Sequence, residues 1–182
     1  MNLTFAALRA ANLARQGPDG WNHRLEDWSA DEWFIAVAGE VGEALNVVKK
    51  LYRDRDGLTG NSKPADALVR DLASELADAV LYLDLFMARA GDTFEQQIGD
   101  RSFAEMRSFT GLHPDESPPS LIGRKIVRAL AGLYDRRGGS LLQLLDDLAF
   151  AFDIDLGAAV VDKFNGTSIK LGFPHRLPVD GG

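Results

Sequence analysis

Apolar residues recur every three or four positions along most of the chain, a spacing typical of amphipathic α-helices. The helices predicted in this way cover residues 3–15, 29–53, 64–89, 121–135, 140–152 and 155–171. Residues 92–107 are only weakly helical, and the alternating pattern of a half-buried strand is nearly absent. The pattern therefore predicts an all-α protein, with six or seven helices joined by short loops in a helical bundle.

The helix over 29–53 has the clearest start. Ser29 is a good N-cap, and Glu32 three residues later completes a capping box. Trp28 and Trp33 are spaced for a hydrophobic staple across the same turn. Gly-rich or Pro-rich stretches separate the helices; we expect "RRGGS" to be a break and "SFTGLHPDESPPS" to be a loop.

Length and composition narrow the class of protein. The chain has 182 residues, 46% of them hydrophobic, which suits one soluble domain with its own core. A net charge of −7 disfavours nucleic-acid binding but allows phosphorylated ligands that a metal ion bridges to acids. Absence of cysteine excludes thiol chemistry and fits a reducing cytoplasm. No apolar run approaches the ~18 residues of a membrane span, so we expect a cytoplasmic protein without a membrane partner.

Two pairs of acidic residues stand out on the two longest predicted helices. Glu40 and Glu43 are three residues apart, as are Glu75 and Asp78, so each pair lies on one side of its helix. Like charges at this spacing repel by roughly a few tenths of a kcal/mol per pair, and burial would increase the repulsion. A divalent cation converts the repulsion into coordination, and an all-oxygen ligand set favours Mg²⁺, Mn²⁺ or Ca²⁺.

A solvated surface is the alternative explanation of these acids. A single pair of this kind is more often exposed than functional. Two pairs on successive helices, each beside small or apolar residues, favour a site instead. Asp71 could be a fifth acid, although an exposed charge in the first turn explains it better. No phosphate-binding GxxxxGK loop, HExxH motif or ExxH pair suggests a competing chemistry.

The order of these motifs resembles that of the MazG family of all-α nucleoside triphosphate pyrophosphohydrolases. The similar blocks are "DWSADEWFIAVAGEVGEALNVVKKL", "ELADAVLYLDL" and "DLGAAVVDKFNGTSIKLGFP". The resemblance implies a bundle of the all-α NTP pyrophosphatase type. It implies cleavage of an NTP or dNTP to the monophosphate and pyrophosphate, with Mg²⁺, or Mn²⁺ as a substitute. The metal ligands would be Glu40, Glu43, Glu75 and Asp78, and Glu43 or Glu40 would activate water.

Contacts to the substrate are also implied by the resemblance. Lys163, Asn165 and Lys170 are candidates for the phosphates, and Lys50, seven residues after Glu43, could also reach them. The nucleobase would meet aromatic residues just before the helix over 29–53 and one turn beyond Asp78. These candidates are Trp21, His23, Trp28 and Tyr82. A solvated charge is the alternative for each lysine, and the staple is the alternative for Trp28 and Trp33.

The chain departs from the compact family pattern between the last two similar blocks. We interpret residues 1–182 as one MazG-like domain with a helical insertion at about 92–152. Family resemblance implies a homodimer or higher homo-oligomer, but an insertion that supplies a second pseudo-repeat would let a monomer imitate a dimer. Two further functions stay open: a non-catalytic helical protein that binds a nucleotide or a partner, and a phosphoribosyl-ATP pyrophosphohydrolase.

Overall fold

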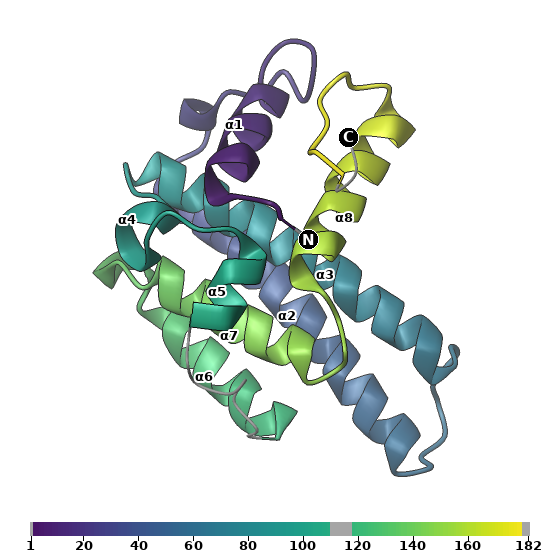
Figure 1. Cartoon of the computed structure of the whole chain (residues 1–182). Helices are drawn as coiled ribbons and strands as arrows, with labels where there is room; N and C mark the ends of the chain where they lie inside the picture. The colour runs from purple at the N-terminus through teal and green to yellow at the C-terminus, as the bar shows by residue number, and fades with distance from the viewer. Residues whose placement is uncertain (1, 110–117, 180–182) are drawn as a thin grey trace.

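Two long helices form the centre of the structure, α2 (Ala30–Arg55) and α3 (Ala65–Arg89). The computed structural model describes residues 2–109 and 118–179, and within these ranges it contains helices but no strands (Figure 1). The other elements are α1 (Phe5–Arg15), η1 (Leu25–Asp27), α4 (Phe94–Ile98), α5 (Phe103–Phe109), α6 (Pro119–Ala131), η2 (Leu133–Asp135), α7 (Gly138–Phe150) and α8 (Leu156–Leu171). The predicted all-α class is therefore confirmed.

The start of α2 follows the predicted capping box. The Ser29 hydroxyl accepts from the Glu32 backbone N–H at 3.3 Å, and the Glu32 carboxylate accepts from the Ser29 backbone N–H at 2.7 Å. The rings of Trp28 and Trp33 lie 4.6 Å apart, as a staple requires. This end of α2 therefore gathers two tryptophans where the loop from α1 arrives.

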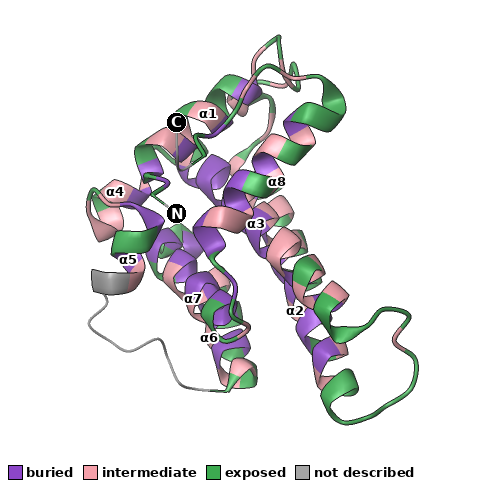
Figure 2. Ribbon diagram, turned by 45° about the vertical axis from the view of Figure 1, so that its right-hand side comes forward, coloured by how far each residue is buried: buried purple, intermediate pink, exposed green. Residues whose placement is uncertain are grey.

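Helix α3 is the element on which the others pack. Its predicted apolar stripe is buried at Leu72, Leu76, Val80, Leu83 and Met87. Toward its C-terminal end nearly every side chain is buried, because α1, α2, α7 and α8 all contact this helix (Figure 2). A helix that is apolar on all sides belongs in the middle of a core.

The region of the expected insertion is a pair of short helices followed by a helical hairpin. Residues 92–107, predicted as weakly helical, form α4 and most of α5, which raises the helix number above the six or seven expected. Helices α6 and α7 pack on each other, with α6 also contacting α2 and α7 contacting α3. Most of the predicted Pro- and Ser-rich loop lies outside the described residues.

The prediction of a break at "RRGGS" is wrong at its two glycines, which form the first turn of α7. A Cβ atom on Gly138 would lie 2.4 Å from the Met87 sulfur, so a larger residue at the start of α7 would force the Met87 side chain to move. No described helix combines the length and the apolar character required to cross a bilayer.

A buried ionic network fastens α1 to α3. Asp84 on α3 is 1% exposed, and its carboxylate accepts from Arg9 Nε at 2.7 Å and from Asn12 Nδ2 at 3.1 Å. Arg9 also donates to the backbone carbonyl of Asp92 at 3.1 Å. Burial raises the pKa of Asp84, and the Arg9 charge opposes that rise. Each partner satisfies the other, so loss of either would leave a buried charge or donor unpaired.

We predict that Arg9→Met lowers the free energy of unfolding by about 3–5 kcal/mol, because Asp84 would stay buried without its cation. Urea denaturation monitored by circular dichroism measures the change. Arg70→Met is the matched control, since Arg70 forms an exposed pair with Asp66 and should cost almost nothing. Equal urea midpoints for the two variants would show that the buried pair of Arg9 and Asp84 does not contribute to stability.

Candidate functional site

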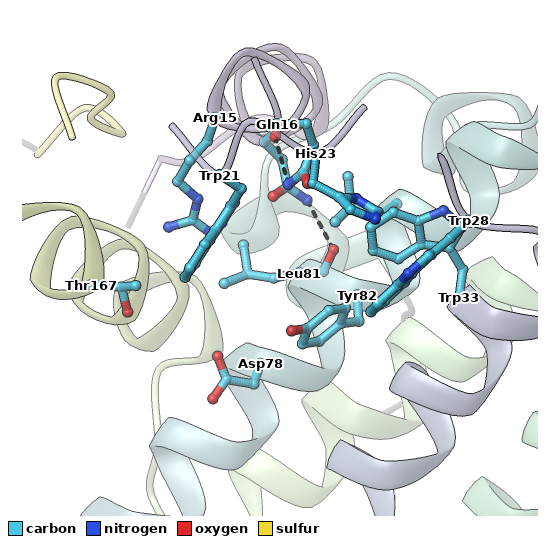
Figure 3. Close-up of a pocket in the computed structure, with 12 residues that line it drawn as sticks. Arg15, Gln16, Trp21, His23, Trp28, Trp33, Asp78, Leu81, Tyr82 and Thr167 are labelled. Atoms are coloured by element: carbon cyan, nitrogen blue, oxygen red, sulfur yellow. Dashed lines mark hydrogen bonds between the residues drawn. The ribbon is translucent and has the colours of Figure 1, made fainter. Parts of the chain in front are cut away.

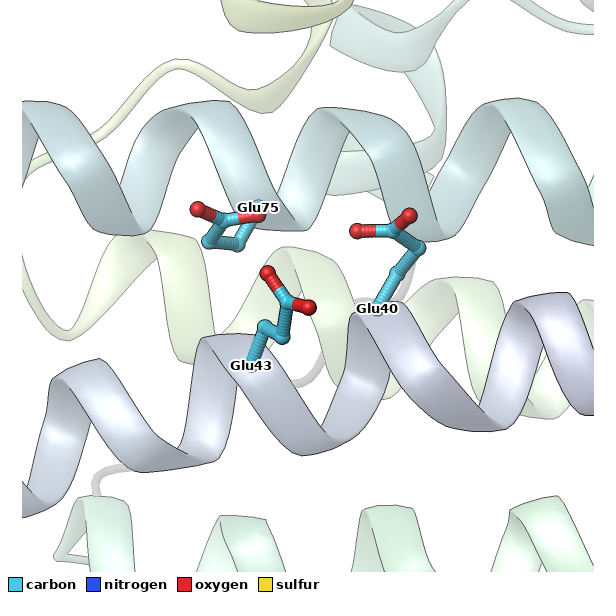
Figure 4. Close-up of side chains that lie close together, drawn as sticks. All are labelled: Glu40, Glu43 and Glu75. Atoms are coloured by element: carbon cyan, nitrogen blue, oxygen red, sulfur yellow. The ribbon is translucent and has the colours of Figure 1, made fainter.

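Three of the predicted acids meet between α2 and α3. Glu40 and Glu43 from α2 and Glu75 from α3 each place one carboxylate oxygen within 4.8 Å of the others (Figure 4). The three-residue spacing on α2 directs both of its glutamates toward α3, and the packing of the two helices brings Glu75 opposite them. Glu40 and Glu75 are half-buried, whereas Glu43 is exposed.

Burial, together with the neighbouring acids, raises the pKa of Glu40 and of Glu75. Burial, followed by repulsion from Asp78, Glu43 and Glu75, raises the pKa of Glu40 from 4.5 to about 7. Burial and the neighbouring Glu43 also raise the pKa of Glu75. The repulsion from Asp78 shows that this fourth predicted acid lies near Glu40.

Asp78 is nevertheless not one of the three converging carboxylates. It forms an ion pair with Lys163 on α8, and Lys163 also donates to the Ser74 hydroxyl at 2.8 Å. Burial raises the pKa of Asp78, and Lys163 opposes this rise. The structure thus brings the predicted phosphate contact Lys163 to the acids, where it neutralises the fourth one.

The donor set suits a hard divalent cation. All three converging ligands are carboxylates, which favours Mg²⁺, Mn²⁺ or Ca²⁺ over softer metals. Exposed acidic groups often cluster without a metal. Here the partial burial of Glu40 and Glu75 gives the repulsion a cost that a cation would remove. The residues present therefore fit the expected metal.

An aromatic cavity of about 310 Å³ lies beside Asp78 (Figure 3). Its aromatic walls are Trp21, His23, Trp28, Trp33 and Tyr82. Ring centroids lie 5.0 Å apart for His23 and Trp28, and 6.3 Å apart for Trp33 and Tyr82. All four predicted base contacts thus line one cavity. Of the four predicted acids, Asp78 alone is among the residues that line the cavity.

A tight turn places Trp21 at the edge of this cavity. The Trp21 backbone N–H donates to the carbonyl of Arg15 at 2.8 Å, which folds the chain back directly after α1. A Cβ atom on Gly20 would lie 2.0 Å from the same carbonyl oxygen, so the turn requires glycine there. Trp21 itself is 46% exposed, and its ring packs on that of Phe173, with 5.1 Å between the ring centroids.

Polar residues from α1, which the sequence interpretation did not single out, form another wall. Asn12, Arg15 and Gln16 line the cavity and are all buried. The Arg15 guanidinium lies 3.6 Å from the centroid of the Phe164 ring, and burial lowers the pKa of Arg15 to about 10. Asn12 and Arg15 follow Phe5 and Leu8 on one face of α1. Their position on the apolar face of a predicted helix was the signal in the sequence that could have identified them as candidates.

Three other predicted contacts line neither the cavity nor the acid cluster. Lys50 lies in a separate cleft of about 160 Å³ that it shares with Lys49 and Arg53. Asn165 uses both polar atoms of its amide on the backbone of Leu177, at 3.0 and 2.8 Å, which fastens the C-terminal segment to α8. Lys170 is exposed in the last turn of α8. Their predicted role in phosphate binding has no support from these positions.

We find no match to this chain among models of protein families, curated proteins or solved structures. The resemblance to MazG proteins therefore rests on the short sequence blocks that carry it. The candidate site does not depend on that resemblance, because it is defined by the positions of its residues in the structure.

We predict that, in metal-free buffer, the stability of the protein falls as the pH rises from about 4.5 to 7. In this window the folded chain keeps a proton on Glu40, whose pKa is about 7, while the unfolded chain has lost it. Thermal unfolding in EDTA at pH 5 and pH 8 measures the effect. Glu40→Gln should lose less stability over the same interval, because its side chain does not titrate.

Mg²⁺ added at pH 8 should raise the unfolding temperature of the wild type and raise that of Glu40→Gln less. Asp54→Asn is the control, since Asp54 is exposed on the same helix. A pH response of Glu40→Gln that equals the wild-type response would contradict the assignment of the raised pKa to Glu40.

Proposed function

We propose that this protein is a Mg²⁺-dependent nucleotide pyrophosphohydrolase, which cleaves an NTP or dNTP to the monophosphate and pyrophosphate. One observation carries the proposal: three carboxylates from two helices converge beside an aromatic cavity, and Asp78 borders both. A nucleotide has the same two parts, a flat ring that can stack and a polyphosphate that a metal ion can join to acids. The order of the sequence motifs agrees with this assignment.

The acids would have two roles in hydrolysis, metal binding and the activation of water. Glu40, Glu43 and Glu75 would hold Mg²⁺, and the ion when bound would neutralise charge that develops on the phosphate oxygens. A water molecule also needs a base, and a base works best when its pKa is close to the working pH. Glu43 or Glu40 would supply that base, through a carboxylate oxygen that the ion does not hold. Lys163, already among the acids, is positioned to meet a phosphate oxygen.

The aromatic walls would hold the nucleobase. Stacking of a base on an aromatic side chain contributes about 1–3 kcal/mol. Trp21 is the most exposed of these rings and lies at the rim, whereas Trp33 is buried and donates its indole N–H to the Leu25 carbonyl at 3.0 Å. Trp33 is therefore a fixed wall, and Trp21 is free to adjust to a ligand.

We predict that the wild-type protein releases pyrophosphate from at least one nucleotide in a panel of NTPs and dNTPs, and only when Mg²⁺ is present. Glu43→Gln should lower the rate by about tenfold to a hundredfold or more, because it removes a metal ligand. Asp54→Asn, an exposed change on the same helix, should keep the wild-type rate.

The panel also separates the alternatives. With phosphoribosyl-ATP added to the panel, release from that compound alone would assign the chain to the pyrophosphohydrolase of histidine biosynthesis. Absence of release from every compound, with nucleotide binding retained, would favour a non-catalytic binding protein.

Assembly is a separate prediction. We expect a homodimer or a higher homo-oligomer, and Ile35, 72% exposed on α2, is an apolar residue that a partner could cover. The monomeric alternative has support of its own, because α6 contacts α2 and α7 contacts α3 within one chain. Light scattering of the purified protein decides between them, since a mass of 19.8 kDa would contradict the oligomer.

A further inference from the structure

One polar atom in the aromatic cavity has no partner. Asn12 on α1 lines the cavity and is 0% exposed, yet its side-chain oxygen Oδ1 makes no hydrogen bond among the described residues. Buried polar atoms in native proteins are nearly always paired, so an exception needs a reason. The contacts of Asn12 with α3 account for its side-chain nitrogen, but they leave the oxygen without a partner.

The orientation of the Asn12 amide is fixed by its neighbours. Its nitrogen Nδ2 donates to the Leu81 carbonyl at 2.8 Å and to the Asp84 carboxylate at 3.1 Å. Both of these partners can only accept, so an exchange of the amide oxygen and nitrogen would set oxygen against oxygen. The nitrogen therefore faces α3, and Oδ1 is the atom that Asn12 has left to offer to a ligand.

A second unpaired atom lies one turn further along α1. Arg15 also lines the cavity, is 5% exposed, and its Nε makes no hydrogen bond, while its terminal nitrogen donates to the Phe164 carbonyl at 3.2 Å. The same cavity thus holds one unpaired acceptor and one unpaired donor. A purely apolar ligand would leave both unpaired, which such a site penalises.

We infer that Asn12 Oδ1 accepts a hydrogen bond from a ring or exocyclic N–H of a nucleobase that is stacked among the aromatic walls. The ligand class is a nucleotide that enters with its Watson–Crick edge toward α1. Proteins read an unpaired base in this way, by stacking combined with hydrogen bonds to that edge. Because Oδ1 is covered, the ligand must shift part of the cavity wall to reach it. The inference rests on the proposed nucleotide substrate and adds the group that reads the base.

Binding to the wild-type protein tests this inference without any change to the fold. Calorimetric titration in EDTA would compare each nucleoside monophosphate with a counterpart whose N–H is blocked by methylation. The pairs are UMP with 3-methyl-UMP, CMP with N4,N4-dimethyl-CMP, AMP with N6,N6-dimethyl-AMP, and GMP with 1-methyl-GMP and N2,N2-dimethyl-GMP. For the parent that binds most tightly, we expect its blocked counterpart to bind at least about tenfold more weakly, because Oδ1 would stay buried without a donor. With UMP, 5-methyl-UMP adds the same methyl group but keeps the N–H.

Protein variants assign the discrimination to Asn12. In Asn12→Ala the parent and its blocked counterpart should bind equally, and circular dichroism checks that the variant is folded at the titration temperature. Thr167→Val is the matched control, since Thr167 lines the same cavity and its loss should leave the discrimination intact. Should Asn12→Ala fail to fold, the comparison of ligand pairs on the wild type still decides the question.

Each result has one meaning. Equal affinities within every pair would overturn the inference and leave a buried water as the partner of Oδ1. Failure of every monophosphate to bind would overturn it too. Selective binding without pyrophosphate release would retain Asn12 as the base reader and reject the proposed hydrolysis. Pyrophosphate release without selectivity at the N–H would retain the proposed hydrolysis and reject Asn12 as the base reader.

Discussion

Where α2 lies along α3, an apolar seam and a group of acids occupy neighbouring sides of the same pair of helices. The seam includes Val37 and Val41 from α2 and Leu72 and Leu76 from α3, all buried. Each such side chain contributes about 1.5–3 kcal/mol when fully removed from water. Repulsion between acids one turn apart on a helix amounts to a few tenths of a kcal/mol. The packing of the apolar seam therefore sets the distance between the two helices, and this distance fixes how close the acids lie to one another.

This imbalance explains how α3 can serve several purposes at once. Along about three turns it carries Glu75 toward the acid cluster, Asp78 toward Lys163, Tyr82 toward the aromatic cavity and Asp84 toward Arg9. Within these turns neighbouring helices bury the residues between them, so these side chains start from a fixed backbone. A site built on such a helix keeps its geometry better than one built on loops.

Periodicity and local motifs were enough to predict the long helices and to place each pair of acids on one side of its helix, whereas the expected group of four acids came from the family resemblance and the structure brings together three of them. A capping box or a three-residue spacing acts within one or two turns, so the sequence displays it directly. The pairing of Asp78 with Lys163 depends on how α8 packs on α3, and no local pattern encodes that contact. Gly138 likewise has meaning only once Met87 is known to lie against it. Asn12 was visible as a polar residue on an apolar face, but its partners belong to another helix.

The two halves of the candidate site are linked through α1 as well as α3. Asn12 donates to the same carboxylate that Arg9 neutralises, so the network that anchors α1 also fixes the amide in the cavity wall. Directly after α1, the turn at Gly20 brings Trp21 to the rim. The side-chain nitrogen of Asn12 thus bonds to α3, whereas its oxygen has no partner among the described residues and stays available to a ligand. A residue divided in this way is positioned before a ligand arrives, so little of the binding free energy is lost in ordering it.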